Sequence, residues 1–280
     1  VRLVSAYYAP QQQYQLQAVF PEPPARLQVT SNVLLVLNDQ KQRVRGGFAL
    51  LPEVEKLFSV RFTVPADWYV TDVATLDGAP LPFERYDGSE GGSQVVVRLP
   101  QGAAPGQVAR ISFGAERVPS GWLGQWQEQV VAFPVFAVQG ATRDRGAIAV
   151  RGEDDLRVRP DQLENLSPLD EEDKQEYGLG GIETSLAYRY EAQPYSAALV
   201  VSRTEPTVTA RCYSFLKLAP ESLTADYEMV YDIRGARARE LSLLLPKETP
   251  ATLSIRGLEG VAIKESNSQE LDAARRWTAR

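Results

Sequence analysis

The segment Phe58-Ser59-Val60-Arg61-Phe62-Thr63-Val64-Pro65 alternates apolar and polar side chains and stops at a proline. Successive side chains of a strand point to opposite faces, so this pattern predicts a half-buried β-strand. The same period recurs in other segments, among them 186–190, 241–245, 253–255 and 261–263. Turn sequences such as Asp77-Gly78 and Pro105-Gly106 separate these runs. No long amphipathic helices alternate with them, so we expect an all-β chain of tandem antiparallel, immunoglobulin-like β-sandwich modules.

One short helix is expected near residues 168–177. Ser167 suits the N-cap, Pro168 the first helical position and Gly178 the C-terminal stop. The residues between them are mostly acidic, which favours the positive end of a helix dipole. Because the segment is polar on nearly every side, we expect a surface helix within a connection.

The chain is similar to itself at an offset of 181 residues, the separation of Ala6 from Ala187. The same offset brings Pro65 onto Pro246 and residues 60–65 onto 241–246, two alternating strands that each end at a proline. Self-similarity at a fixed offset is the signature of a repeated structural unit. The alternative is coincidental similarity between two β-rich stretches.

The repeat gives a domain division. Residues 1–13 would end a preceding unit, 14–194 would form one unit, and 195–280 would begin another, so that the piece comes from a longer chain. Within the unit, residues 14–118 would form a sandwich and 119–194 a second β part with the helix. That second part is either a smaller sheet or the completion of the sandwich.

Composition excludes several kinds of site. The 280 residues include no histidine and one cysteine, Cys212, so no imidazole-dependent catalytic pair, His-ligated metal, internal disulfide or cysteine-cluster metal site is available. Two carboxylates suffice for glycoside hydrolysis, but nothing singles out a pair among the 36 acidic residues. We therefore expect no catalytic residues and no cofactor in this chain; whether a longer parent protein is an enzyme stays open.

The net charge of −6 argues against nucleic acid or an anionic membrane surface as the partner. No apolar stretch approaches the roughly 18 residues of a membrane span, so no membrane insertion is expected. The partners that remain are neighbouring domains of the same chain, a polysaccharide or another protein.

Two tryptophans form the candidate ligand-binding surface. Trp122 and Trp126, with Gln125 and Gln127 beside them, could stack on sugar rings while the amides bind hydroxyl groups. That hypothesis requires both indoles to be exposed on one face. The alternative is that the two tryptophans fill the seam between the two parts of the unit.

Acidic residues gather at 153–155 and 170–173. Calcium binds such oxygen clusters, and Asp154 and Asp155 are the candidate ligands, although no Asp-x-Asp-x-Asp-Gly loop is present. The alternative is a solvated charged face. Five arginines make the middle of the chain locally basic: Arg143, Arg145, Arg151, Arg157 and Arg159. We interpret them as cross-strand partners of the nearby acidic run.

Three segments carry a family resemblance: residues 61–68, 186–190 and 243–246, each an alternating strand with a proline or a second strand close behind. They resemble large bacterial envelope or secreted proteins of unknown function built from recurring β-sandwich modules. The resemblance implies an extracytoplasmic location in the periplasm, at the cell surface or outside the cell, and brings no catalytic residues. The expected function is a non-catalytic structural or adhesive module. The alternatives are a carbohydrate-binding module and an accessory domain of a larger enzyme.

Overall fold

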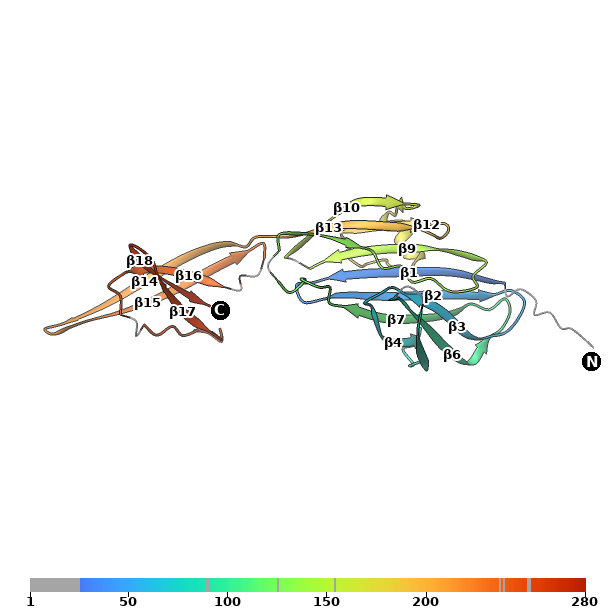
Figure 1. Cartoon of the computed structure of the whole chain (residues 1–280), viewed down its shortest axis with the longest axis horizontal. Helices are drawn as coiled ribbons and strands as arrows, with labels where there is room; N and C mark the ends of the chain where they lie inside the picture. Colours follow the sequence, from blue (N-terminus) through green and yellow to red (C-terminus); the bar gives the residue numbers. More distant parts are fainter. Residues whose placement is uncertain are drawn as a thin grey trace, which may run out of the picture.

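A computed structural model describes residues 26–88, 91–124, 126–153, 155–236, 238, 240–250 and 253–280. Their regular structure is almost entirely β, with one short helix, which confirms the all-β prediction. Strands β1 to β13 form the larger body, and β14 to β18 lie beyond one end of it (Figure 1). No helix in the described part of the chain is long and apolar enough to span a membrane.

Sheet A is the seven-stranded backbone of the larger body, in the order β11-β12-β9-β1-β2-β7-β4. Its strands are β1 (Leu27–Leu37), β2 (Gln42–Pro52), β4 (Tyr69–Thr75), β7 (Ala109–Arg117), β9 (Arg143–Gly152), β11 (Ser167–Pro168) and β12 (Leu186–Tyr190). All neighbours are antiparallel except β1 and β9, which run parallel.

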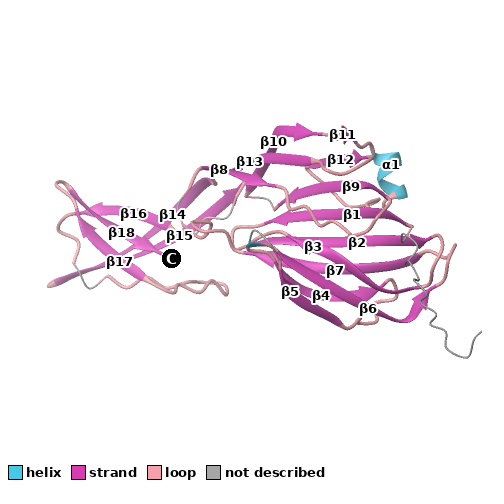
Figure 2. Ribbon diagram, turned by 45° about the vertical axis from the view of Figure 1, so that its right-hand side comes forward, coloured by secondary structure: helices cyan, strands magenta, loops and turns pink. Residues whose placement is uncertain are grey.

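Two smaller sheets pack against one face of sheet A, so the body is sandwich-like (Figure 2). Sheet B has the order β3-β6-β5 and sheet C the order β10-β13-β8. Their strands are β3 (Leu57–Val64), β5 (Phe83–Asp87), β6 (Ser93–Ala103), β8 (Glu128–Ala132), β10 (Leu156–Glu164) and β13 (Ser196–Arg203). The alternation at 58–64 puts Val60, Phe62 and Val64 into the core, as predicted, whereas Phe58 at the start of the run is 60% exposed.

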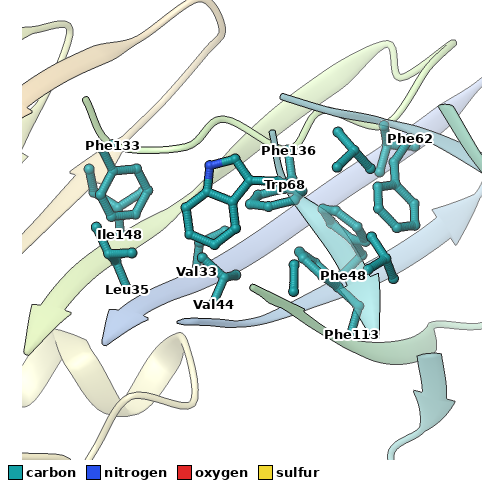
Figure 3. Close-up of a cluster of buried hydrophobic side chains, with 14 of the residues drawn as sticks. Val33, Leu35, Val44, Phe48, Phe62, Trp68, Phe113, Phe133, Phe136 and Ile148 are labelled. Atoms are coloured by element: carbon teal, nitrogen blue, oxygen red, sulfur yellow. The ribbon is translucent and has the colours of Figure 1, made fainter. Parts of the chain in front are cut away.

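The core contains a chain of aromatic contacts (Figure 3). Phe48 stacks on Phe113 with ring centroids 5.1 Å apart, and Phe62 lies 5.3 Å from Phe48. Phe136 contacts Phe113 at 4.9 Å and meets Trp68 edge-on at 6.1 Å. These rings come from β2, β3, β7 and two connections, so the cluster joins sheet A to the layer that covers it.

The helix α1 (Glu171–Glu176) covers the opposite face of sheet A. Leu169, Tyr177 and Leu179 pack there against Ala147 and Ala149 of β9, which explains why β9 is buried on both faces. The predicted cap is wrong: Ser167 and Pro168 pair with β12, and the N-cap is Asp170, whose carboxylate accepts a hydrogen bond from Asp173 N at 2.9 Å. Three residues beyond Ser167, Asp170 is a stronger acceptor at the start of the turn.

Residues 119–194 complete the sandwich-like larger body, because β9 and β12 extend sheet A while β8 and β10 build sheet C. The expected boundary at residue 195 falls immediately before β13, which pairs with both β10 and β8. The last strand of the larger body therefore lies within the range 195–280. The expected unit end, residues 1–13, lies outside the described residues.

The smaller body consists of a hairpin and a three-stranded sheet. The hairpin pairs β14 (Thr207–Ala219) with β15 (Ser222–Arg234). The sheet has the order β16-β18-β17, with β16 (Leu241–Pro246), β17 (Ser266–Glu270) and β18 (Ala274–Ala279).

Candidate functional site

A groove of about 1180 Å³ lies on the outer face of sheet A. Its floor is made by outward-facing residues of the central strands: Thr30 and Asn32 on β1, Gly47 and Ala49 on β2, and Ser112 on β7. These side chains are small. Short side chains leave a depression in the sheet surface here, and the larger residues around it form the rim of the groove.

The segment that contains α1 forms one wall of the groove. Asn32 Nδ2 donates to the carbonyl of Tyr177 at 2.6 Å and so holds the end of the helix to the floor. Lys174 is buried, and its Nζ donates to the Glu171 carboxylate and, at 2.8 Å, to Thr184 Oγ1. Burial, reinforced by the nearby Glu176, raises the pKa of Tyr177. The hydrogen bonds of Asn32 and Lys174 thus anchor this wall to the rest of the larger body.

Positive charge surrounds the floor of the groove. Arginines enter from three strands: Arg45 on β2, Arg110 on β7, and Arg143, Arg145 and Arg151 on β9. The acidic lining residues are Glu176 and Glu183. Within the described residues only Arg145 of these five arginines has an ion-pair partner, Glu176, at 3.6 Å. A lining with this excess of cations favours an anionic ligand.

Strand register explains how the arginines converge. Arg145 lies opposite Thr30, Thr30 opposite Ala49, and Ala49 opposite Arg110, in one row across β9, β1, β2 and β7. Neighbouring strands are about 4.8 Å apart, so Arg145 and Arg110 stand roughly 14 Å apart across the floor. Guanidinium groups bind carboxylates in a bidentate manner, which suits a row of anionic groups laid over the floor.

The interpretation of the central arginines as partners of the run 153–155 is wrong for the residues that the structure describes. Arg145 pairs with Glu176, and Arg159 pairs with Glu128 at 3.1 Å. Arg143, Arg145 and Arg151 lie on the outer face of sheet A, where they line the groove. The sequence analysis did not single out Arg45 and Arg110 as site residues, although the alternation of apolar and polar residues in β2 already indicates that Arg45 faces outward.

The hypothesis of two exposed indoles is also corrected. Trp122 is fully buried in the core, and its Nε1 donates to the carbonyl of Asn38 at 2.8 Å. Trp126 is half-buried; its Nε1 donates to the carbonyl of Trp122, and its ring lies under the guanidinium of Arg203. The two indoles are 4.9 Å apart and join the start of sheet C to the β1–β2 turn. Gln127 is exposed, and Gln125 lies outside the described residues.

The predicted calcium site at Asp154 and Asp155 stays a prediction, because only Asp155 is among the residues that the structure describes. No group of three or more acidic or thiol side chains there is arranged to hold a metal ion. Asp155 is half-buried, and its carbonyl accepts from Thr204 N at 2.9 Å. Asp154 lies outside the described residues.

A polar cluster lies at the edge of the core beside β9. Asp144 accepts hydrogen bonds from Tyr190 Oη at 3.0 Å and from Gln193 Nε2 at 2.8 Å, and Ser31 bonds to the same tyrosine hydroxyl. Burial raises the pKa of Asp144, and the hydrogen bonds oppose that shift. Burial raises the pKa of Tyr190 and of Tyr195, which stacks on it at 4.3 Å. The cluster joins the 190–195 connection to β9, and of its residues only Ser31 also lines the groove.

No family model matches the chain, and no curated protein matches it. Among solved structures, an M1 zinc metallopeptidase from Deinococcus radiodurans has a TM-score of 0.37 and 12% identity, covering 84% of this chain and 50% of its own. Leukotriene A4 hydrolase from Saccharomyces cerevisiae has a TM-score of 0.35 and 11% identity, covering 71% of this chain and 31% of its own. The chain thus spans half the length of these proteins or less. Likeness at this level assigns neither fold nor activity.

Proposed function

We propose that the chain is a non-catalytic binding module, which presents the arginine-lined groove of sheet A to an acidic segment of a protein partner. The observation that carries this proposal is the gathering of Arg45, Arg110 and Arg143 around a floor of small side chains, without a carboxylate partner among the described residues. Unpaired cations of one sign on one face mark a surface that attracts the opposite charge.

A polypeptide fits the groove better than a nucleic acid. The chain as a whole carries a charge of −6, so a long polyanion that extended past the groove would be repelled by the rest of the surface. A short acidic segment meets only the basic groove. Its partner protein is either a neighbouring domain of the same polypeptide or a separate chain, and both agree with an adhesive or structural role.

The test is fluorescence polarisation with a labelled ten-residue polyglutamate peptide. Exposed ion pairs contribute about 0.2–1 kcal/mol each, so removing three charges lowers affinity by about threefold to 150-fold. We expect that loss in the triple variant Arg45→Gln, Arg110→Gln, Arg143→Gln. The matched control is Arg157→Gln, an exposed arginine on β10, which should bind as the unmodified chain does.

Two results would overturn this proposal. Equal binding by the triple variant and the unmodified chain would place the peptide elsewhere. Binding of an acidic polysaccharide such as heparin, with no binding of polyglutamate, would replace the polypeptide by an acidic glycan. Binding should also weaken as salt concentration rises, because the contacts are exposed.

An accessory domain of a larger enzyme is the second proposal, and it is compatible with the first. In that case the acidic segment would belong to the catalytic part, and adding this chain in trans would change the enzyme's activity or stability. The extracytoplasmic location is also a proposal; it depends on the sequence resemblance and is tested by fractionating cells that express the natural protein.

A further inference from the structure

A hollow of about 780 Å³ lies on the outer face of sheet B, on the other side of the core from the arginine-lined groove. All three strands of the sheet contribute to it: Phe58 and Arg61 on β3, Glu84 and Tyr86 on β5, and Val96 and Arg98 on β6. None of these residues lines the groove, so the sheet B hollow is a separate surface.

A break in the strand ladder turns Phe58 toward this hollow. Regular alternation of the run would bury its ring, but the β3–β6 register shifts between Leu57 and Ser59. Leu57 is half-buried and packs against the core, while Phe58 is 60% exposed. Bulges of this kind re-aim side chains and are enriched beside functional sites. The exposed ring is therefore a candidate contact for a ligand.

The exposed rings at the two ends of the hollow are held in position. Phe58 lies over Gly102, where a Cβ would be 3.0 Å from two atoms of the ring. Tyr86 is 50% exposed, and its hydroxyl donates to the Glu84 carboxylate, which also accepts from Arg98 at 2.6 Å. These two hydrogen bonds lower the pKa of Glu84, so the carboxylate stays ionised. Side chains that are already ordered lose less entropy when a ligand binds.

The two rings are too far apart for one small molecule to contact both. Tyr86 lies opposite Gln94, and Gln94 lies opposite Thr63. This row crosses two strand spacings of about 4.8 Å each, and Thr63 follows Phe58 by roughly 16 Å along β3. The Cα atoms of Phe58 and Tyr86 are therefore roughly 19 Å apart. A ligand that contacts both rings is an extended chain.

The polar groups between the rings suit hydroxyl groups. Arg61 offers donors, the Glu84 carboxylate offers acceptors, and Gln94 offers both. Hydroxyl groups donate and accept, so a ligand rich in them can satisfy all three side chains. An apolar protein surface would instead remove these groups from water without replacing their hydrogen bonds.

We propose that the outer face of sheet B binds a neutral oligosaccharide chain, whose sugar rings stack on Phe58 and Tyr86 while its hydroxyl groups bond to the polar side chains between them. A sugar ring has flat apolar faces and a polar rim, which matches aromatic side chains that flank polar ones. Glu84 is paired with Arg98, so among the charged side chains named here only Arg61 adds a net charge. The chain itself carries −6, so a neutral glycan fits this face better than a polyanion.

Isothermal titration calorimetry with four neutral hexasaccharides tests the proposal: cellohexaose, xylohexaose, mannohexaose and chitohexaose. We expect at least one of them to bind the unmodified chain. Phe58→Ala and Tyr86→Ala should each weaken that binding by about twofold to tenfold, and the double variant by about fivefold to a hundredfold. Tyr86→Phe keeps the ring and should lose less affinity than Tyr86→Ala. Both rings are exposed, so circular dichroism should show the same folded spectrum for every variant.

The matched control is Tyr69→Ala, because Tyr69 is also 60% exposed but lies on β4 outside the hollow. It should bind the sugar as the unmodified chain does. The triple variant of the arginine-lined groove should also bind the sugar normally while it loses polyglutamate, so the two proposals succeed or fail separately. Raising the salt concentration from about 50 to 500 mM should change sugar affinity by less than about twofold, because no ion pair forms with a neutral ligand.

Three results would overturn the inference. The first is that none of the four sugars binds at millimolar concentration. The second is that Phe58→Ala and Tyr86→Ala bind as tightly as the unmodified chain, or lose no more affinity than Tyr69→Ala. The third is that the triple variant of the groove loses sugar binding, because the sugar would then occupy the groove on sheet A.

Discussion

Trp122 Nε1 donates a hydrogen bond to the main-chain oxygen of Asn38 at 2.8 Å, joining residues that are 84 positions apart. Asn38 shapes the β1–β2 turn, since its side-chain oxygen accepts from the amides of Gln40 and Lys41. The indole thus fills the core and fixes the turn at the same time. Trp126 and Arg203 then pack over it from the side of sheet C.

Replacing Trp122 should destabilise the larger body strongly. Removing a fully buried aromatic side chain costs about 3–5 kcal/mol, so Trp122→Ala should lower the free energy of unfolding by that amount. Urea denaturation followed by far-UV circular dichroism measures the change. The control is Leu123→Ala, because Leu123 is 66% exposed; it should stay within about 0.5 kcal/mol. A Trp122→Ala chain as stable as the control would show that the indole is not part of the core.

Gly46 should not accept a side chain. It lies directly opposite Phe113 in the ladder, and a Cβ on Gly46 would lie 2.2 Å from Cζ of that ring. Overpacking a core costs about 1–3 kcal/mol, so Gly46→Ala should lower the free energy of unfolding by that amount. A double-mutant cycle with Phe113→Leu measures the coupling. Because leucine is smaller than phenylalanine, Gly46→Ala should cost less stability when residue 113 is leucine. If the effects of the two substitutions on the free energy of unfolding simply add, the proposed clash is contradicted.

The fold class could be predicted from the period of two in segments such as 58–64, since side-chain direction in a strand is a local property. Which strands pair with which could not be predicted in the same way. The parallel pair β1–β9 joins residues more than a hundred positions apart, and nothing in either segment specifies the other. The same limit applies to the groove. Arg45 and Arg110 come together only when β2 and β7 pair, and the local pattern shows no more than that Arg45 faces outward.

The tryptophans show a different limit. Two indoles near glycines are compatible with an exposed platform or with a core plug, and only tertiary packing distinguishes them. The hydrogen bond from Trp122 to the β1–β2 turn, in another part of the chain, shows that this indole is a core residue. The basic groove, by contrast, is not required by the fold. If the repeat holds, the counterpart of Arg45 in β15 is Asp226, a residue of opposite charge.

Removing the helix cap should loosen the wall of the groove. The Asp170 carboxylate accepts from the amide of Asp173, and losing an N-cap costs about 0.5–2 kcal/mol. In Asp170→Ala, we expect faster amide hydrogen exchange within 171–179, and little change in β9 and β1 beneath it. Asp170→Asn is the matched control, because asparagine also caps helices. Equal exchange in both variants would mean that the side-chain cap does not hold the wall.

The Asp144 carboxyl should make stability depend on pH. Burial raises its pKa above the ordinary range of an aspartate, and the hydrogen bonds from Tyr190 and Gln193 only partly oppose this. Between the ordinary pKa and the raised one, the folded protein holds a proton that the unfolded chain has released. The free energy of unfolding therefore falls as pH rises through this window.

Asp144→Asn isolates that effect, because the amide does not ionise in this range and keeps an oxygen for the tyrosine hydroxyl. We would measure urea denaturation of both proteins at a series of pH values and subtract the two free energies of unfolding. The stability of the unmodified protein relative to the variant should decline as pH rises from the ordinary aspartate pKa and level off above the raised one. All other titrating groups cancel in the difference. A difference that stays constant, or that grows with pH, would show that burial does not control this carboxyl.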